Sequence, residues 1–314
     1  MSGIFTLTLN PAVDKSTTVE RVMAENKMRC AIPKFEPGGG GINVSRAIKK
    51  LGGDSTAIYT QGGPTGDNLK KLLDKENIQQ IILNTESWTR ENFIVVETGT
   101  NRQFRFGMPG QEITLTEANA MLELLKDDKY QYEYLVVSGS TPSSISSSFY
   151  YEVSSIAKSK NAKLILDTSG EPLKEALKVG IYLLKPNLAE LGELLGASDD
   201  DLDTIEEQEQ AAKQVIAENK IEVLAVSLGA FGAMAASAQS VNHIPAPSVK
   251  KQSTVGAGDS MVGGIVLSLS KGESILNSIR YGVACGTAAT MNTGTELCKK
   301  TDVDRLYKWI IEKS

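Results

Sequence analysis

Apolar positions along this chain recur with two different periods, and each change of period marks the end of a predicted element. Ile4 to Leu9 alternates with a period of two and stops at Asn10-Pro11, as a strand followed by a turn does. From residue 116 onward, helix-like segments alternate regularly with short apolar runs. The helix-like segments are 116–125, 148–159 and 205–219, and the runs are 134–137, 163–166 and 223–227. Repeated βα units of this length predict an α/β fold whose sheet is mostly parallel and covered on both faces.

Two β-rich segments near the N-terminus interrupt the otherwise alternating βα pattern of the chain. Residues 17–35 mix β-branched residues without a helical period, and the runs 93–97 and 103–106 flank a turn-like Thr-Gly-Thr-Asn sequence. We predict that these segments form a small sheet outside the main one. The remaining expected elements are helices over 43–51, 66–76, 259–269, 274–292 and 302–313, and strands over 55–59 and 78–83.

Composition narrows the class of protein. The 314 residues carry a net charge of −5, which argues against a nucleic-acid or anionic-membrane partner. The sequence lacks an apolar run of about 18 residues, and Met1-Ser2-Gly3 leads straight into a strand pattern, so we expect neither a membrane span nor a signal peptide. The three cysteines are too few and wrongly spaced for a zinc site or a disulfide framework, which fits a reduced, cytoplasmic location. The acidic stretch 199–203 is typical of a solvated loop.

A glycine-containing turn with a following aspartate gives the clearest chemical signal. Gly256 and Gly258 flank Ala257 and let the backbone turn tightly, so that successive N–H groups point into one concavity at the start of a helix. Such a concavity binds anions, and a phosphoryl group in transfer is the anion that most needs it. Asp259 lies beside it and suits the role of base for a substrate hydroxyl. The alternative is an ordinary stabilising Asp in a first helical turn.

Two further features lie near the N-terminus. Asp14 follows the first predicted strand, where open α/β sheets place ligand groups, although turn chemistry alone explains an Asp there equally well. Residues 38–41 are four glycines ahead of a predicted helix, and they match neither a Walker loop nor a dinucleotide-binding fingerprint. They permit very close approach of the backbone to a ligand. A flexible linker is the alternative, which the adjoining helix disfavours.

Together these motifs resemble the ribokinase-like (PfkB) family of sugar kinases. The resemblance is carried, in order along the chain, by Gly38–Gly41 with Asn43, Lys185-x-Asn187-x-x-Glu190, Ser227-Leu228-Gly229, and Thr254 to Asp259. It implies an α/β fold with a doubly wound, mostly parallel sheet and a small β-sheet lid. The implied main domain comprises residues 1–14, 36–87 and 109–314. The implied lid comprises residues 15–35 and 88–108, and would also form the interface of a homodimer.

The resemblance also implies roles for individual residues. Asp259 would be the catalytic base, and the N–H groups of Gly256, Ala257 and Gly258 would stabilise charge on the transferred phosphoryl group. The implied sugar-phosphate positions are Asp14, Arg29, Gly39, Asn43, Arg90 and Ser140, with Lys27 from the partner subunit. The implied ATP positions are Lys185, Asn187, Ser227, Gly229, Gly232, Val283 and Thr287. Asn187 and Glu190 would organise Mg²⁺ through water, and the positions that match a K⁺ site of relatives are Ser253, Val255, Ala289, Asn292 and Gly294.

The reaction implied is phosphoryl transfer from MgATP to a phosphorylated ketohexose, with the 1-hydroxyl of fructose 6-phosphate as the leading acceptor. Tagatose 6-phosphate and fructose 1-phosphate are the alternatives within the family, because the kinases that act on them share most of these motifs. A dinucleotide-binding oxidoreductase is disfavoured because Asn-Pro-Ala-Val-Asp, and not a glycine fingerprint, follows the first strand. A non-catalytic sugar-phosphate sensor is disfavoured because Asp259 accompanies an intact Gly-Ala-Gly turn.

Overall fold

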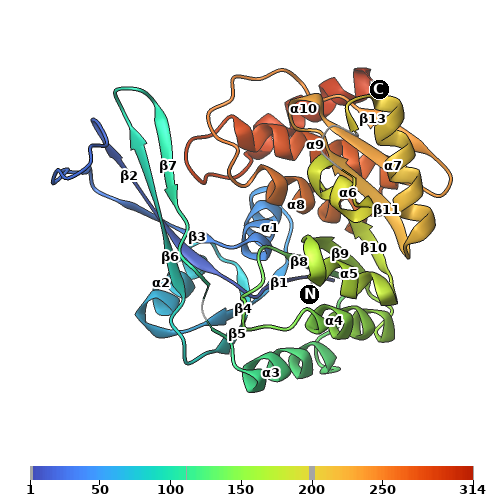
Figure 1. Ribbon diagram of the computed structural model, residues 1–314, viewed down its shortest axis with the longest axis horizontal. Coiled ribbons are helices and arrows are strands. Elements are labelled where there is room, and N and C mark those ends of the chain that lie inside the picture. Colours follow the sequence, from blue (N-terminus) through green and yellow to red (C-terminus); the bar gives the residue numbers. More distant parts are fainter. Residues whose placement is uncertain (1–2, 111, 198–201, 314) are drawn as a thin grey trace.

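A nine-stranded sheet forms the centre of the larger part of the protein (Figure 1). The computed structural model describes residues 3–110, 112–197 and 202–313. The strands lie in the order β13 (Val241–Ile244), β12 (Ala233–Ser237), β11 (Ile221–Ser227), β10 (Ile181–Leu184), β9 (Lys163–Asp167), β8 (Tyr134–Ser138), β1 (Ile4–Thr8), β4 (Thr56–Gln61) and β5 (Gln79–Asn84). The strands from β11 to β5 are parallel, whereas β12 and β13 form an antiparallel edge. The prediction of a mostly parallel sheet is confirmed.

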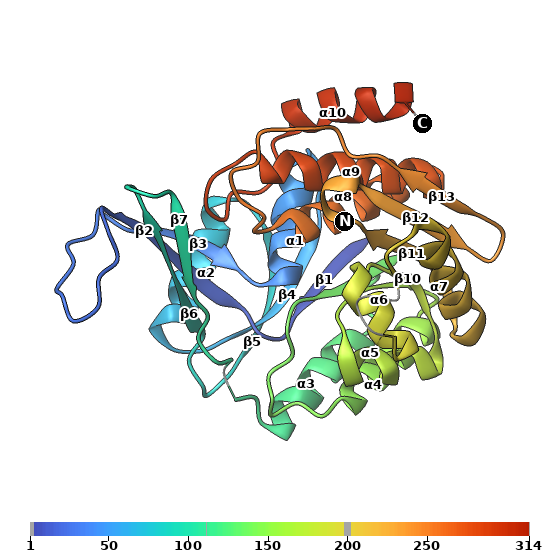
Figure 2. The ribbon, with the colours of Figure 1, turned by 45° about the horizontal axis from the view of Figure 1, so that its top comes forward.

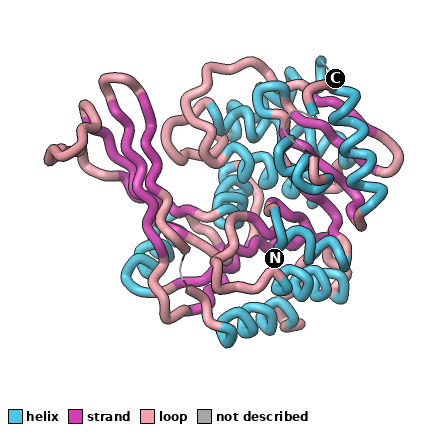
Figure 3. The backbone as a smooth tube through the Cα atoms, in the orientation of Figure 1, coloured by secondary structure: helices cyan, strands magenta, loops and turns pink. Residues whose placement is uncertain are grey.

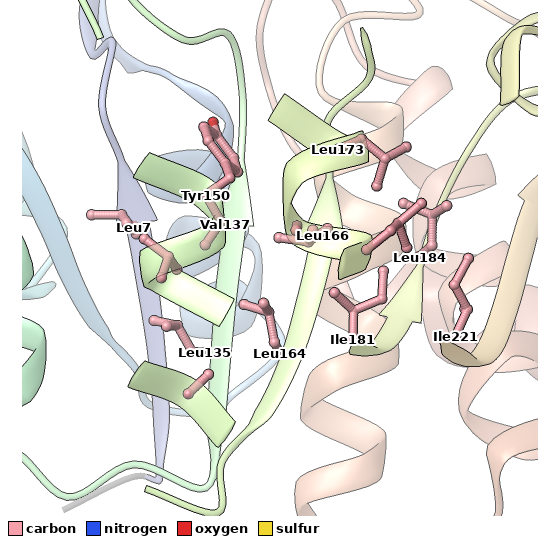
Figure 4. Packing of buried hydrophobic residues seen from close by; sticks show 14 of the residues in the cluster. Leu7, Leu135, Val137, Tyr150, Leu164, Leu166, Leu173, Ile181, Leu184 and Ile221 are labelled. Atoms are coloured by element: carbon pink, nitrogen blue, oxygen red, sulfur yellow. The ribbon is translucent and has the colours of Figure 1, made fainter. Parts of the chain in front are cut away.

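Helices cover both faces of this sheet. Alternate residues of a strand face opposite sides, so Leu135 and Val137 of β8 belong to one core whereas Val136 belongs to the other. Figure 4 shows part of the first core. Its helices are α3 (Leu115–Lys126), α4 (Ser148–Ser159), α5 (Gly170–Val179), α6 (Leu188–Leu195) and α7 (Ile205–Glu218). The helices of the second core are α1 (Gly40–Lys50), α8 (Ala257–Ser270), α9 (Ile275–Thr290) and α10 (Lys300–Lys313).

A second sheet, with four strands, projects from this body (Figures 2 and 3). Its strand order is β3 (Lys34–Gly38), β2 (Ala12–Val19), β6 (Arg90–Glu97) and β7 (Arg102–Phe106). Strands β6 and β7 form the predicted hairpin, and β2 runs parallel to β6. Helix α2 (Gly63–Lys75) packs against β2 and β3. The predicted fold class, a doubly wound α/β sheet with a separate small sheet, is therefore confirmed, while its use as a lid stays a prediction.

Some elements differ from the sequence-based expectation. Asp14 lies inside β2 and not in a turn, because Ala12 and Val13 are already fully buried and paired with β3 and β6. Helix α1 begins at Gly40, ahead of the expected Asn43. Helices α5 and α6 and strand β12 were not expected.

Two other expectations concern an acidic loop and membrane-spanning helices. Most of the acidic stretch expected to be a solvated loop, residues 199–201, lies outside the described residues. Among the helices of residues 3–110, 112–197 and 202–313, none combines the length and the apolar character that a membrane crossing requires.

Candidate active site

Helix α8 brings Asp259 to the edge of the sheet where the parallel strands end. The N-cap of the helix, Gly256, has a φ of 72°, a left-handed conformation that glycine adopts without strain. Ala257 and Gly258 follow in the first turn, where backbone N–H groups have no acceptor one turn earlier in the helix, and the Ala257 N–H makes only a long hydrogen bond, 3.4 Å, to the Thr254 carbonyl. This local geometry can present N–H groups to an anion beside the Asp259 carboxylate.

Asp259 is surrounded by polar side chains from other elements. Asn43 Nδ2 donates to Asp259 Oδ2 at 3.0 Å, and Ser138 Oγ donates to Oδ1 at 3.5 Å. Ser138 Oγ also lies 3.3 Å from Asp167, whose carboxylate pairs with Lys185 at 3.0 Å. Burial and the negative charge of Asp167 raise the pKa of Asp259 to about 6. At neutral pH this carboxylate is therefore mostly ionised and can accept a proton.

A second polar cluster joins the small sheet to the turn after β1. Asn92 Nδ2 donates to Asp14 Oδ1 at 2.8 Å, and Arg90 Nη1 donates to Asn92 Oδ1 at 3.4 Å. Arg90 Nη2 also donates to the Asn10 carbonyl at 3.2 Å, and Asn10 Nδ2 donates to Ser140 Oγ at 2.9 Å. Burial raises the pKa of Asp14, an effect that Asn92 and Arg90 partly offset. The structure thus brings together three predicted sugar-phosphate residues, Asp14, Arg90 and Ser140.

The glycine run connects this cluster with Asp259. A Cβ added to Gly38 would lie 2.8 Å from the Asp14 carboxylate, so only glycine leaves room there. Gly39, the N-cap of α1, has a φ of 112°, and a Cβ on it would meet the side chain of Thr8 at 2.7 Å. The helix that follows carries Asn43 to Asp259. The glycine run therefore borders the Asp14 cluster, and Asn43 on the helix that follows it contacts Asp259.

Two predicted sugar-phosphate residues lie elsewhere in the single chain. Lys27 and Arg29 are exposed and belong to the segment between β2 and β3, which extends beyond the end of the small sheet (Figure 1). The length of β2 separates this segment from Asp14. Their participation would require a second subunit, which the resemblance implies for Lys27 alone.

A cavity of about 450 Å³ lies on the other side of the α8 start. Its walls come from the end of β11, from α8 and α9, and from the segment after β13. Five of the predicted ATP positions line it: Ser227, Gly229, Gly232, Val283 and Thr287. Ala257 and Gly258 line it too, so the helix start with its N–H groups borders both the cavity and Asp259.

Lys185 lies next to this helix start. Its ammonium nitrogen is 3.6 Å from the point where a Cβ on Gly258 would stand, and its side chain is buried. Burial opposes the charged form, but the charge and hydrogen bond of Asp167 outweigh it and raise the pKa of Lys185. Lys185 is thus a fixed positive charge beside the predicted anion site.

Asn187 and Glu190, the predicted magnesium-organising residues, form a capping box at the start of α6. Asn187 Oδ1 accepts from the Glu190 N–H and Glu190 Oε2 accepts from the Asn187 N–H, both at 2.8 Å. The Glu190 carboxylate also lies close enough to raise the pKa of Lys185. Within the described part of the chain, no three His, Cys, Asp or Glu side chains converge to hold a metal ion alone. The donor set fits an ion bound mainly by water and substrate phosphates.

The predicted potassium positions lie on two adjacent loops, except Ala289, which lies near the end of α9. Ser253 Oγ donates to the Gly294 carbonyl at 2.8 Å, and the Val255 N–H donates to Ser253 Oγ at 3.2 Å. Asn292 Nδ2 donates to the Leu297 carbonyl at 3.0 Å, and the Ala289 carbonyl accepts from the Asn292 N–H at 3.1 Å. Backbone carbonyl oxygens are ligands that a monovalent cation accepts, so these residues supply donor atoms of a suitable kind, and the bound ion stays a prediction.

The structure adds site residues that sequence reasoning missed. Ser138 and Asp167 are the last residues of β8 and β9, and both contact Asp259 or its surroundings. The rule that singled out Asp14, a polar residue at a strand end, applies to both. Asn92 lies within β6, and only the pairing of β6 with β2 reveals that it faces Asp14.

The chain belongs to the pfkB family of carbohydrate kinases, whose model matches residues 3–302. It is 40% identical over 311 residues to the ATP-dependent 6-phosphofructokinase isozyme 2 of Escherichia coli, with 99% of each chain covered. It is 39% identical over 309 residues to the enzyme of that name from Mycobacterium tuberculosis, with 98% of this chain and 90% of the relative covered. The crystal structure of E. coli phosphofructokinase-2 in complex with potassium matches with a TM-score of 0.94 and 39% identity, covering 99% of this chain and 100% of that one.

Two relatives that carry other enzyme names are less similar to the chain than these. A 1-phosphofructokinase of Borreliella burgdorferi is 33% identical over 304 residues, with 96% of each chain covered. A tagatose-6-phosphate kinase of Staphylococcus epidermidis is 30% identical over 311 residues, with 98% of each chain covered. The protein is thus a sugar kinase, and the predicted family is confirmed.

Proposed function

We propose that this protein transfers the γ-phosphoryl group of ATP to the 1-hydroxyl of fructose 6-phosphate, giving fructose 1,6-bisphosphate. The position of Asp259 carries the proposal. It adjoins Gly258, which lines the 450 Å³ cavity, and it accepts a hydrogen bond from Asn43, next to the glycine run that borders Asp14. The greater similarity to 6-phosphofructokinases than to the tagatose-6-phosphate kinase and the 1-phosphofructokinase supports this choice of sugar.

In the proposed mechanism, the protein positions two anionic substrates and neutralises their charge. Asp259 takes the proton from the 1-hydroxyl as its oxygen attacks the γ-phosphorus, and the bond from that phosphorus to the bridging oxygen of ADP breaks. Lys185 and the N–H groups at the start of α8 stabilise charge on the transferred group. Arg90, with Lys27 of a second subunit, holds the existing phosphate. A bound magnesium ion would neutralise further triphosphate charge.

The finer features of the enzyme are part of the same proposal. We propose a homodimer that meets through the small sheet, because that sheet and its loops expose Met23, Met28, Ile32, Phe35 and Phe106. Potassium is proposed for the two loops that carry Ser253 and Gly294, since the E. coli relative is described in complex with potassium. The unpaired state of the three cysteines supports a cytoplasmic location.

Steady-state phosphorylation of three acceptors by MgATP tests the proposal: fructose 6-phosphate, tagatose 6-phosphate and fructose 1-phosphate. We expect kcat/KM to favour fructose 6-phosphate by about a hundredfold, which corresponds to about 2.7 kcal/mol of transition-state discrimination. A preference for another acceptor would retain the chemistry but reassign the sugar. If none of the three acceptors supported ATP hydrolysis or phosphoryl transfer, the non-catalytic sensor would be favoured.

A further inference from the structure

Arg46 is a buried cation that the proposed mechanism does not use. It lies on α1, its side chain is only 3% exposed, and burial of a charge at this depth requires partners for its donors. Its Nε donates to both carboxylate oxygens of Glu76 at 3.0 and 2.9 Å, and its Nη2 donates to Glu76 Oε1 at 2.7 Å. Glu76 is the C-cap residue of α2, so this pair fixes the guanidinium between two helices.

The remaining guanidinium nitrogen points toward the candidate site. Arg46 Nη1 donates to the Pro37 carbonyl at 2.9 Å and to Asn43 Oδ1 at 3.2 Å. A guanidinium has donors only, so the amide atom that faces Arg46 must be the oxygen of Asn43. The NH₂ group of Asn43 then faces Asp259 and donates to its Oδ2 at 3.0 Å.

We infer that Arg46 and Glu76 are positioning residues that hold the Asn43 amide in the orientation that stabilises the ionised form of Asp259. The inference rests on the proposed role of Asp259 as base. Without Arg46, the amide can rotate by half a turn and accept a hydrogen bond from a protonated Asp259. With Arg46 in place, only the donating orientation satisfies both neighbours, so the ionised base is favoured.

The groups that face Asp259 determine its titration, so a test must separate their effects from that of Arg46. They are Asp167 at the end of β9, Lys185 after β10, Ser138 at the end of β8 and Asn43 on α1. Arg46 reaches Asp259 through Asn43, and Arg46→Lys keeps the positive charge while losing the planar fork that binds Glu76 and Asn43 together. A changed titration of Asp259 in this variant would therefore reflect orientation and not charge.

The test is a direct titration of Asp259 in protein labelled with ¹³C at aspartate carboxyl carbons, with the resonance assigned by its loss in Asp259→Asn. We expect Arg46→Lys to raise the midpoint by about 0.5 pH unit or more. We expect Asn43→Ala to raise it too, and the double variant Arg46→Lys/Asn43→Ala to match Asn43→Ala alone. An unchanged midpoint in folded Arg46→Lys, or additive shifts in the double variant, would overturn the inference.

In a second variant, Glu76→Gln, the direction in which the Asp259 midpoint shifts distinguishes an effect of charge from an effect of amide orientation. Loss of a negative charge alone would lower the Asp259 midpoint, whereas release of Arg46 and Asn43 would raise it. Lys49→Met is the matched control, because it removes the pair with Asp54 from the same helix without touching Asn43; a shift there would count against the inference.

The acid limb of the kcat/KM profile should move with the midpoint for whichever acceptor the wild type uses. An inactive wild type would contradict the proposed function, while the titration would still decide the role of Arg46.

Discussion

The pKa of Asp259 results from opposing effects of its surroundings. Burial and, after it, the charge of Asp167 raise its pKa, and the hydrogen bond from Asn43 lowers it. Lys185 counters Asp167 through a 3.0 Å ion pair and also lowers the pKa of Asp259. The value of about 6 keeps the base ionised at neutral pH without making it so acidic that proton transfer is disfavoured.

This balance predicts the pH dependence of the reaction. A base must be ionised, so kcat/KM of the wild type should fall about tenfold per pH unit below about 6. Asp167→Asn leaves the burial of Asp259 but removes the nearby charge that adds to the rise of its pKa, so the acid limb should lie at lower pH than that of the wild type. Steady-state profiles at constant ionic strength measure both limbs. Asp304→Asn, at an exposed position on α10, is the control, and a limb that moves upward in Asp167→Asn would contradict the assignment.

The role of Asp259 itself is tested by Asp259→Asn. The amide is isosteric and cannot accept the proton, so we expect kcat to fall by about 10²- to 10⁴-fold while KM for the sugar changes little. Initial rates at saturating MgATP measure this. Turnover within a few-fold of the wild type would rule out Asp259 as the base.

At the scale of elements, the sequence predicts the βα alternation well because its apolar periods are long and regular. The start of α1 illustrates what it does not predict. Helix propensity places Gly40 outside a helix, but a Cβ there would lie 2.4 Å from Ser138 Oγ, so tertiary packing requires glycine inside the first turn. The Asn187–Glu190 pair does carry a helix-start signal, a capping box, and the family resemblance predicts a magnesium role for the same two residues.

The candidate site shows a similar division. Asp259 and its glycine turn are local in sequence and were predictable, and residues at strand ends such as Asp167 could have been found by the rule applied to Asp14. The roles of Asn92 and Arg46 could not be predicted, because their partners, Asp14 and Glu76, lie 78 and 30 residues away in the sequence. Strand pairing brings the first pair together, and helix packing the second.

A buried hydrogen bond joins the small sheet to the loop that carries the predicted potassium ligands. Thr295 Oγ1 donates to Glu36 Oε2 at 2.7 Å, and both residues are buried. Thr295→Val keeps the shape but leaves the Glu36 carboxylate without this donor, which should lower the free energy of unfolding by about 1–3 kcal/mol. Urea unfolding at fixed protein concentration measures the change.

Lys34→Met is the matched control for Thr295→Val. Lys34 pairs with the same carboxylate at 3.0 Å, but its side chain is 64% exposed, so its loss should cost less than about 1 kcal/mol. An equal or larger loss in Lys34→Met than in Thr295→Val would mean that the buried hydrogen bond does not stabilise this junction.

At the scale of the whole molecule, the small sheet leaves apolar side chains uncovered. Ile32 is 95% exposed, and Met23, Met28 and Phe35 near it are partly exposed as well, on the segments that project from the body in Figure 2. Lys27 lies on the same projecting segment, away from Asp14 of its own chain. A second copy that covers these apolar residues would also be the source of Lys27 for the sugar phosphate.

Ile32→Glu therefore tests assembly and activity together. Placing a charge among these apolar residues should weaken the proposed dimer by at least tenfold in Kd. Sedimentation velocity over a dilution series measures the dimer, and KM for the sugar phosphate should rise as the monomer accumulates because Lys27 is withdrawn. Leu115→Glu, at a 78% exposed position on α3, is the control and should leave both quantities unchanged. A wild type that sediments as a monomer while keeping a low KM would refute the shared site, because Lys27 could then not come from a partner.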